Sequence, residues 1–183
     1  MSKKVLICLA DGFEEIEAIT IIDVLSRAEL DVTVGGVSGK SVNGAHGVKV
    51  EADIELSKYK DSPDAIVLPG GMPGSKNLGD SPLVAEIIKK ANKDKKILGA
   101  ICAAPAMAFA KHGILEGKNA TCYPGFEQHF QSSTKFSSDR VVVDGNVITS
   151  RGPGTALEFA LELVAQLADK KKAAELREGM LVK

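Results

Sequence analysis

Short apolar runs rich in Val, Ile and Leu alternate with longer amphipathic segments along this chain. The runs predict strands at residues 5–10, 30–38, 64–71, 96–102 and 119–124, with a short strand pair around residues 41–52. The amphipathic segments predict helices at residues 14–28, 81–92, 105–113 and 153–168, and a charged helix at the end. Buried strands that alternate with helices predict an α/β fold, in which helices cover both faces of a mostly parallel sheet.

Local turn signals agree with this alternation. Ser81-Pro82 marks the start of one predicted helix, and Gly113 is expected to end another. Asp144-Gly145 lies between two β-branched runs within residues 140–150, which predicts a β-hairpin. The 183 residues suffice for one substantial core, and they contain no repeat, low-complexity stretch or linker. We therefore expect one domain over residues 1–183.

Charge and cysteine content exclude several classes of protein. With 23 Lys and Arg against 24 Asp and Glu, the chain has no global field to attract nucleic acid or membrane. Its three cysteines lack Cys-x-x-Cys spacing, which argues against a disulfide scaffold or structural zinc site and fits a reducing cytoplasm. The start of the chain is typical of a first strand and not of a signal peptide, and no run reaches membrane-spanning length.

The segment KKILGAICAAPAMAFA, residues 95–110, places Cys102 at a turn from strand to helix. The free N–H groups of the helix start are expected to favour the thiolate, the reactive form of cysteine. Small residues around it, including Ala103, leave room for a tight turn and a small substrate. Such a turn predicts unfavourable backbone dihedral angles at Cys102. The alternative is that Cys102 is a small buried hydrophobe, as free cysteines usually are.

Other polar loops end at the same predicted sheet edge. In open α/β sheets, ligands bind at the carboxyl ends of the strands. The loops there carry an acidic segment at residues 11–17, the pair Gly70-Gly71, and Cys102. Backbone N–H groups at Gly70 and Gly71 could stabilise an oxyanion formed when a thiolate adds to a carbonyl. Taken alone, however, a Pro-Gly-Gly sequence is more often just a turn.

Glu17 stands on an otherwise apolar helix face, which is predicted to comprise residues 13, 16, 17, 20 and 24. Burial there should raise the pKa of its carboxyl group toward neutrality. The carboxyl group could then donate a hydrogen bond to a thiolate or move a proton during catalysis. The alternative is an acid stabilised by the helix dipole, which we take as the explanation for Glu14 and Glu15.

The three histidines and the other two cysteines give weaker signals. None of His46, His112 and His129 is placed by the sequence as a general base for Cys102. Cys8 lies in the middle of a buried strand and is expected to be inert. Cys122 could face the sheet edge, which leaves a resolving role for this thiol open.

Five segments resemble the ThiJ/PfpI superfamily, and within it the branch of the parkinsonism-associated deglycase (the DJ-one protein) and its bacterial YajL-type relatives. In chain order these segments are ADGFEEIEAITIIDVLSRA, VLPGGMPGSKNL, AICAAPAMA, ATCYP and TSRGPGTALEFAL. The resemblance extends over nearly the whole chain and is closest to the YajL-type members. It implies a flavodoxin-like sandwich, a homodimer, a reactive cysteine at Cys102, and neither a metal nor an organic cofactor.

The same resemblance implies roles for further residues. Glu17 would be the partner carboxyl group, and the backbone amides of Gly71 and Ala103 would line the pocket. Arg151, accompanied by Pro153, resembles a residue that approaches the site across the dimer interface. Arg27 matches another cationic residue of the pocket.

Two positions depart from the family pattern. Tyr123 stands where the eukaryotic deglycase branch has histidine, which removes a proposed general acid or base. His46 stands where many relatives have arginine, and the resemblance implies that anion binding is altered. A Cys–His–Glu triad is therefore not expected here.

Three functions remain open at this point. The leading hypothesis is a cofactor-independent enzyme that acts on reactive dicarbonyls, converting methylglyoxal to lactate, or on their early adducts with protein side chains. The rival is a stress sensor or chaperone that is switched when Cys102 is oxidised to sulfinate. A thiol amidase or peptidase is the weakest of the three, because it needs an activating base and a leaving-group acid.

Overall fold

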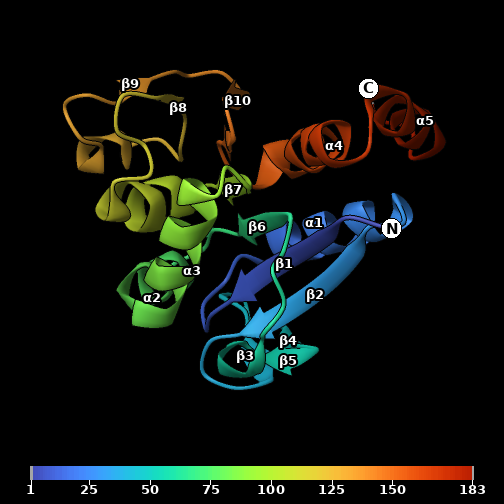
Figure 1. Cartoon of the computed structure of the whole chain (residues 1–183), viewed down its shortest axis with the longest axis horizontal. Helices are drawn as coiled ribbons and strands as arrows, with labels where there is room; N and C mark the ends of the chain where they lie inside the picture. The colour runs from blue at the N-terminus through green and yellow to red at the C-terminus, as the bar shows by residue number, and fades with distance from the viewer. Residues whose placement is uncertain (1, 183) are drawn as a thin grey trace.

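The computed structural model describes residues 2–182, and a seven-stranded sheet forms its middle layer. The strand order is β10-β11-β7-β6-β1-β2-β5, and only the β10–β11 pair is antiparallel (Figure 1). The bounds are β1 Lys4–Leu9, β2 Asp31–Gly36, β5 Ile54–Glu55, β6 Ala65–Leu68, β7 Ile97–Ile101, β10 Val141–Asp144 and β11 Val147–Ser150. The mostly parallel sheet and the hairpin predicted at residues 140–150 are confirmed.

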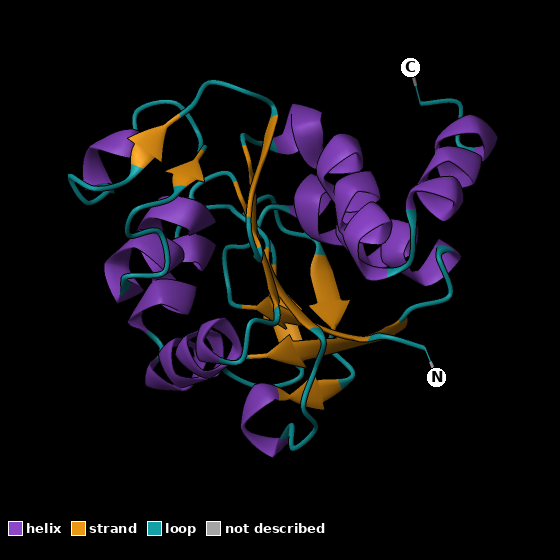
Figure 2. Ribbon diagram, turned by 45° about the horizontal axis from the view of Figure 1, so that its top comes forward, coloured by secondary structure: helices purple, strands orange, loops and turns teal. Residues whose placement is uncertain are grey.

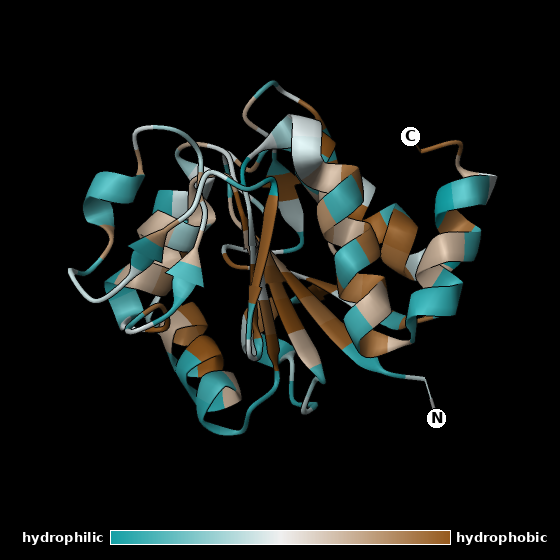
Figure 3. Cartoon of the chain, turned by 90° about the horizontal axis from the view of Figure 1, so that it is seen from above, coloured by the Kyte–Doolittle hydropathy of each residue, from teal (hydrophilic) through white to brown (hydrophobic). Residues whose placement is uncertain are grey.

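Helices cover both faces of this sheet, as Figure 2 shows. One face carries α1 (Glu15–Arg27), α4 (Ala156–Leu167) and α5 (Lys170–Gly179), which pack on one half of the core. The other carries α2 (Gly74–Asp80) and α3 (Pro82–Lys93). The strands between them are almost entirely apolar, whereas the outer helix faces are polar (Figure 3). This is the predicted α/β sandwich.

Local signals account for several boundaries. Ser81 caps α3 by accepting a hydrogen bond from the Val84 N–H at 3.4 Å, and Pro82 occupies the first helical position. Helix α2 was not predicted, because its sequence GSKNLGD contains residues with poor helix propensity. The segment predicted as a helix at residues 105–113 is helical but irregular. It comprises a π-helix, η2 (Pro105–Phe109), and a 3₁₀ turn, η3 (Ala110–His112), which ends at Gly113 with a φ of 74°.

Several short elements lie outside the main sheet. The predicted pair near residues 41–52 is confirmed as the antiparallel strands β3 (Ser41–Asn43) and β4 (Lys49–Glu51). The strand predicted at 119–124 is correct only at its start, because β8 (Asn119–Ala120) pairs with β9 (Lys135–Phe136) and then ends. The remaining turns are the 3₁₀ helices η1 (Leu56–Lys58), η4 (Glu127–His129) and η5 (Pro153–Thr155).

The buried face of α1 differs from the predicted one. Ile16 is 58% exposed, and the buried positions of the helix are Glu15, Glu17, Ala18, Ile21, Val24 and Leu25. Of the five predicted positions, Phe13, Glu17 and Val24 are buried and Thr20 is half-buried, so Ile16 is the position that was wrong. The face was counted from Phe13, whereas the helix begins only at Glu15. Glu17 nevertheless points inward, as predicted.

Within residues 2–182, the structure has no helix that is both long and apolar enough to span a membrane. The assignment of residues 1–183 to one domain stays a prediction.

Candidate active site

Cys102 follows β7 directly and has a left-handed backbone conformation, with a φ of 64°. Its N–H donates to the Ser150 carbonyl at 3.0 Å, and its carbonyl accepts from the Tyr123 N–H at 2.8 Å. These bonds to two separate segments hold a conformation that costs a non-glycine residue about 1 kcal/mol or more. The predicted strain at Cys102 is confirmed.

Glu17 approaches the same point from α1 and is completely buried. Its Oε2 accepts a hydrogen bond from the Gly70 N–H at 2.7 Å, whereas its Oε1 has no hydrogen-bond partner in the described chain. Burial raises the pKa of Glu17 to about 7, and the hydrogen bonds from the Gly70 N–H and the Cys102 thiol oppose this shift only in part. The predicted rise toward neutrality is confirmed.

Gly70 lies between these two side chains. A methyl group at this position would overlap both Cys102 Cβ and Glu17 Oε2. The next residue, Gly71, has a φ of 91°, which favours glycine. The glycine pair after β6 therefore lets the thiol and the carboxyl group approach each other across the backbone.

The pKa of the Cys102 thiol is shifted in the direction opposite to the one expected from the sequence. Burial, and then the negative charge of Glu17, raise the pKa of the Cys102 thiol to about 12. The N–H groups of Gly71 and Ala103 act in the other direction and favour the thiolate, but they are outweighed. Because an ionised Glu17 repels the thiolate, the sulfur can ionise readily only when Glu17 holds the proton. With a pKa of about 7 for Glu17 and about 12 for Cys102, the pair loses its first proton near pH 7, and the form with a thiolate and a protonated Glu17 is its minor form.

A cavity of about 300 Å³ opens at Cys102. The other lining residues are Glu14, Ala45, His46, Gly71, Met72, Ala103, Tyr123, Phe126 and Pro153. The structure thus gathers four of the residues singled out in the sequence around the sulfur, namely Gly71, Ala103, Tyr123 and Pro153. Glu17 and Gly70 lie buried against it.

Neither arginine singled out in the sequence lines this cavity. Arg27 is exposed near the far end of α1, about 15 Å along the helix from Glu17, and pairs with Asp23 at 2.7 Å. The Arg151 guanidinium lies 6.0 Å from the centre of the Phe136 ring and donates to the Ser138 carbonyl at 3.0 Å. An approach of Arg151 to the site across a dimer interface stays a prediction, and so does the pocket role of Arg27.

Glu15 and His46 form a contact that the sequence did not predict. Glu15 Oε1 accepts the His46 N–H at 2.6 Å and the Val48 N–H at 3.3 Å, and its Oε2 lies 2.9 Å from His46 Nδ1. Burial works to raise the pKa of Glu15, but these hydrogen bonds prevail and lower it to about 2. The helix dipole is thus not a sufficient explanation for Glu15, which anchors the loop that forms one wall of the cavity.

The same contact bears on metal binding. Glu14, Glu15 and His46 bring one potential ligand atom each within 4.8 Å of one another. The polar atoms of Glu15 are already occupied by the hydrogen bonds to residues 46 and 48, so the cluster is accounted for as an anchor of the loop. The expected independence from metals and cofactors stays a prediction.

The other two cysteines are both fully buried. Burial raises the pKa of Cys8 to about 12, which fits the inert role expected for it. Burial, and then the charge of Glu127, also raise the pKa of Cys122 to about 12. A resolving role for Cys122 stays a prediction.

The fold and the site together define a class of protein. It is a flavodoxin-like α/β sandwich with a strained cysteine and a buried carboxyl group at the carboxyl edge of its sheet. The sequence profile of the DJ-1/PfpI family matches residues 3–166. The chain therefore belongs to the DJ-1/PfpI family.

Individual relatives agree with this assignment. Protein dj-1beta of Drosophila melanogaster is 43% identical over 185 residues, which cover 100% of this chain and 98% of the relative. The crystal structure of Drosophila melanogaster DJ-1beta superimposes with a TM-score of 0.96 over 100% of both chains. Protein DJ-1 homolog B of Arabidopsis thaliana is 46% identical over 96% of this chain, which spans only 40% of that longer relative. The glutathione-independent glyoxalase DJR-1.2 of Caenorhabditis elegans is 38% identical over 89% of this chain and 87% of its own. A special closeness to the YajL-type members stays a prediction.

Proposed function

We propose that this chain is a cysteine-dependent enzyme that converts small reactive dicarbonyls, such as methylglyoxal, to hydroxy acids. The observation that carries the proposal is the close approach of Cys102 and the buried Glu17 carboxyl group on either side of Gly70, beside a cavity. The 38% identity to a glutathione-independent glyoxalase supports it. Apart from the water that hydrolyses the intermediate, the reacting groups that it requires are side chains and amides of this chain.

In the first step, the Cys102 sulfur adds to the aldehyde carbon of the substrate. A carbon–sulfur bond forms, and the electron pair of the carbonyl double bond moves to its oxygen. The N–H groups of Gly71 and Ala103, which favour a negative charge at the sulfur, stand beside the developing oxyanion. The proton held by Glu17 neutralises that oxygen, which gives a hemithioacetal.

In the second step, Glu17 moves a hydrogen between neighbouring carbons. Its carboxylate removes the proton from the sulfur-bearing carbon, and the electrons pass to the adjacent carbonyl to form an ene-diolate. Glu17 then returns the proton to the adjacent carbon, and the hydroxyl proton of the sulfur-bearing carbon passes to the neighbouring oxygen, which gives a thioester of a 2-hydroxy acid. Water hydrolyses the thioester and restores the thiol. A pKa of about 7 suits a group that must both take and give a proton.

The cavity limits the substrate to a small carbonyl compound or the end of a modified side chain. At about 300 Å³, with Met72, Tyr123 and Phe126 in its wall, it has room for a three-carbon dicarbonyl. With an early dicarbonyl adduct of a lysine, arginine or cysteine side chain in place of the free aldehyde, the same steps would release the repaired side chain.

We extend the proposal to a cytoplasmic homodimer. Ile16, Ile19 and Val48 are 58%, 44% and 52% exposed, and a second copy of the chain would cover them. Three free cysteines fit a reducing compartment.

The test is lactate formation from methylglyoxal by purified, chelator-treated protein. Wild type should turn over, Cys102→Ser and Glu17→Gln should not, and Cys122→Ser is the matched control that should keep its activity. A Cys122→Ser variant that loses activity would show that the wrong thiol has been chosen.

The rival function is oxidation sensing, and Tyr123 in place of a histidine beside the thiol favours it. Mild peroxide followed by mass spectrometry of the intact protein separates the two functions. If wild type shows no turnover but gains two oxygens selectively at Cys102, the sensor replaces the enzyme.

A further inference from the structure

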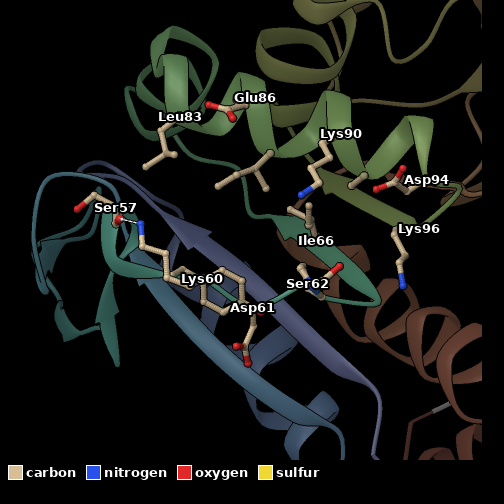
Figure 4. A pocket seen from close by; sticks show the side chains of 14 residues that line it. Ser57, Lys60, Asp61, Ser62, Ile66, Leu83, Glu86, Lys90, Asp94 and Lys96 are labelled. Carbon is tan, nitrogen blue, oxygen red and sulfur yellow. Dashed lines mark hydrogen bonds between the residues drawn. The ribbon is translucent and has the colours of Figure 1, made fainter.

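A second cavity, of about 360 Å³, lies between α3 and the loop that connects η1 to β6 (Figure 4). It shares no lining residue with the cavity at Cys102. The chemistry proposed for Cys102 gives it no role, so its occupant has to be inferred from its own lining.

Apolar side chains line much of this cavity. Ile66 of β6 faces Leu83, Ile87 and Ala91 of α3, and Tyr59 of the connecting loop also contributes to the lining. Such a lining favours the compact apolar body of a small ligand, which would bury its surface there.

Lys90 is an exposed lysine of α3 that also lines this cavity. Glu86 and Asp94 lie one helical turn before and after it, at the spacing that normally gives ion pairs. Within residues 2–182, however, Lys90 forms no ion pair with either of them. Figure 4 shows its ammonium group directed into the cavity toward Ile66, whereas the two carboxylates point elsewhere.

The other two lysines of the lining, and its third acidic residue besides Glu86 and Asp94, already have partners. Asp61 pairs with Lys4, Lys96 with Asp64 at 3.3 Å, and Lys60 Nζ donates to the Ser57 carbonyl at 3.1 Å. In the described chain, Lys90 is therefore the lysine of this cavity that has neither a hydrogen-bond nor an ion-pair partner.

Tyr59 adds a second available donor. Its side chain is half-buried, and its hydroxyl group makes no hydrogen bond within residues 2–182. Burial, and then the charge of Asp61, raise the pKa of Tyr59 to about 12, so the hydroxyl keeps its proton at neutral pH. The charges of Asp31 and Asp64 also raise the pKa of Tyr59, so carboxylates lie near Tyr59 as well as near Lys90. With one cation and one neutral donor among them, the lining matches a ligand with at most one negative charge and disfavours a doubly charged phosphate.

We propose that this cavity binds a small monocarboxylate with a compact apolar body. The carboxylate accepts hydrogen bonds from Lys90 and Tyr59, and the apolar body packs on Ile66, Leu83 and Ile87. The site is independent of the reaction proposed for Cys102, so neither proposal depends on the outcome of the other.

The experiment titrates 3-phenylpropionate into the full chain and follows the methyl NMR signals. Shifts should concentrate at Ile66, Leu83 and Ile87. The neutral analogue 3-phenylpropanol should bind about tenfold more weakly, because it lacks the charge that Lys90 recognises.

Three variants test the donors. Lys90→Gln should weaken binding about tenfold, and Tyr59→Phe about threefold to tenfold. Lys89→Gln is the matched control, because Lys89 is an exposed neighbour on the same helix that does not line the cavity. It should leave binding within about twofold of wild type.

Each contrary result would overturn the proposal. Equal losses in Lys89→Gln and Lys90→Gln would mean diffuse charge attraction, and equal binding of the alcohol would mean an apolar hollow without anion recognition. Shifts confined to the methyl groups of Met72 and Ala103 would place the ligand in the Cys102 cavity instead. The absence of any shift at millimolar ligand would mean that no such site exists.

Discussion

Glu15 and Glu17 lie in the first turn of α1 and are both buried, yet their pKa values move in opposite directions. Burial works to raise both values. Glu15 accepts hydrogen bonds from the side chain and backbone of His46 and from the Val48 backbone, and its pKa falls to about 2. Glu17 has only the Gly70 N–H and the Cys102 thiol as donors, and its pKa rises to about 7. The supply of hydrogen-bond donors therefore decides the charge of each group. One carboxyl group becomes a structural anchor, and the other can carry a proton.

The largest expected contrast between the two acids is in turnover. Glu17→Gln should lower kcat/KM for methylglyoxal about a thousandfold, because it removes the group that moves the proton. Glu15→Gln should lower it less than about tenfold, because Glu15 only holds a loop of the cavity wall. Lactate formation measures both, and similar losses in the two variants would contradict this division of roles.

The pH dependence of turnover sharpens the same contrast. The reactive form, with the proton on Glu17 and a thiolate at Cys102, exists only after the pair has lost its first proton near pH 7. Wild-type kcat/KM should thus rise about tenfold per pH unit up to about pH 7 and then level off. A rate that continues to climb tenfold per unit from pH 7 to pH 9 would mean that the thiol ionises without help from Glu17.

Most of the fold was accessible from the sequence because its signals are local. Buried Val, Ile and Leu runs, the Ser81-Pro82 helix start and the Asp144-Gly145 turn each act within a few residues. The elements that were missed or misjudged are short or irregular, such as α2 with its two glycines and the two-residue strand β8. Their formation depends on the segments they pack against.

The features of the site also divide into those that the sequence predicted and those that depend on tertiary contacts. The carboxyl-end rule brought Glu17, Gly70-Gly71 and Cys102 together, because it depends only on strand order. The contact between Glu15 and His46 joins residues that are 31 apart in the sequence, and no local sequence pattern predicts it. The direction of the Cys102 pKa shift was also missed. The helix start is visible in the sequence, but the opposing burial and the charge of Glu17 are tertiary effects.

Stability should respond to pH through Glu17. Its folded pKa lies above its ordinary value, so the folded state holds the proton more tightly, and ionisation destabilises the fold. Wild type should therefore lose on the order of 2 to 3 kcal/mol of unfolding free energy between about pH 4.5 and pH 7, relative to Glu17→Gln. Urea unfolding of both proteins across this range measures the difference. Parallel curves would mean that Glu17 is not buried in the way described.

The contribution of Glu15 to stability should depend on pH in the opposite direction and more weakly. Its folded pKa lies below its ordinary value, so it stabilises the fold above about pH 4.5, and this contribution is lost as the pH falls toward 2. The hydrogen bond to Glu15, and then the charge of Glu14, raise the pKa of His46, so the imidazolium contributes fully below its ordinary pKa of 6.5 and less as the pH rises through its folded value. The two effects overlap between about pH 4.5 and 6.5.

In that window, Glu15→Gln should be less stable than wild type by about 1 to 2 kcal/mol, a figure kept small because His46 is largely exposed. The difference in unfolding free energy between the two proteins should become smaller below about pH 4.5 and above about pH 6.5. A double-mutant cycle with His46→Asn identifies the partner, since the loss in Glu15→Gln should shrink when the imidazole is already absent. If the loss is unchanged, the backbone N–H groups of residues 46 and 48 alone hold Glu15, and the His46 side chain contributes nothing to the anchor.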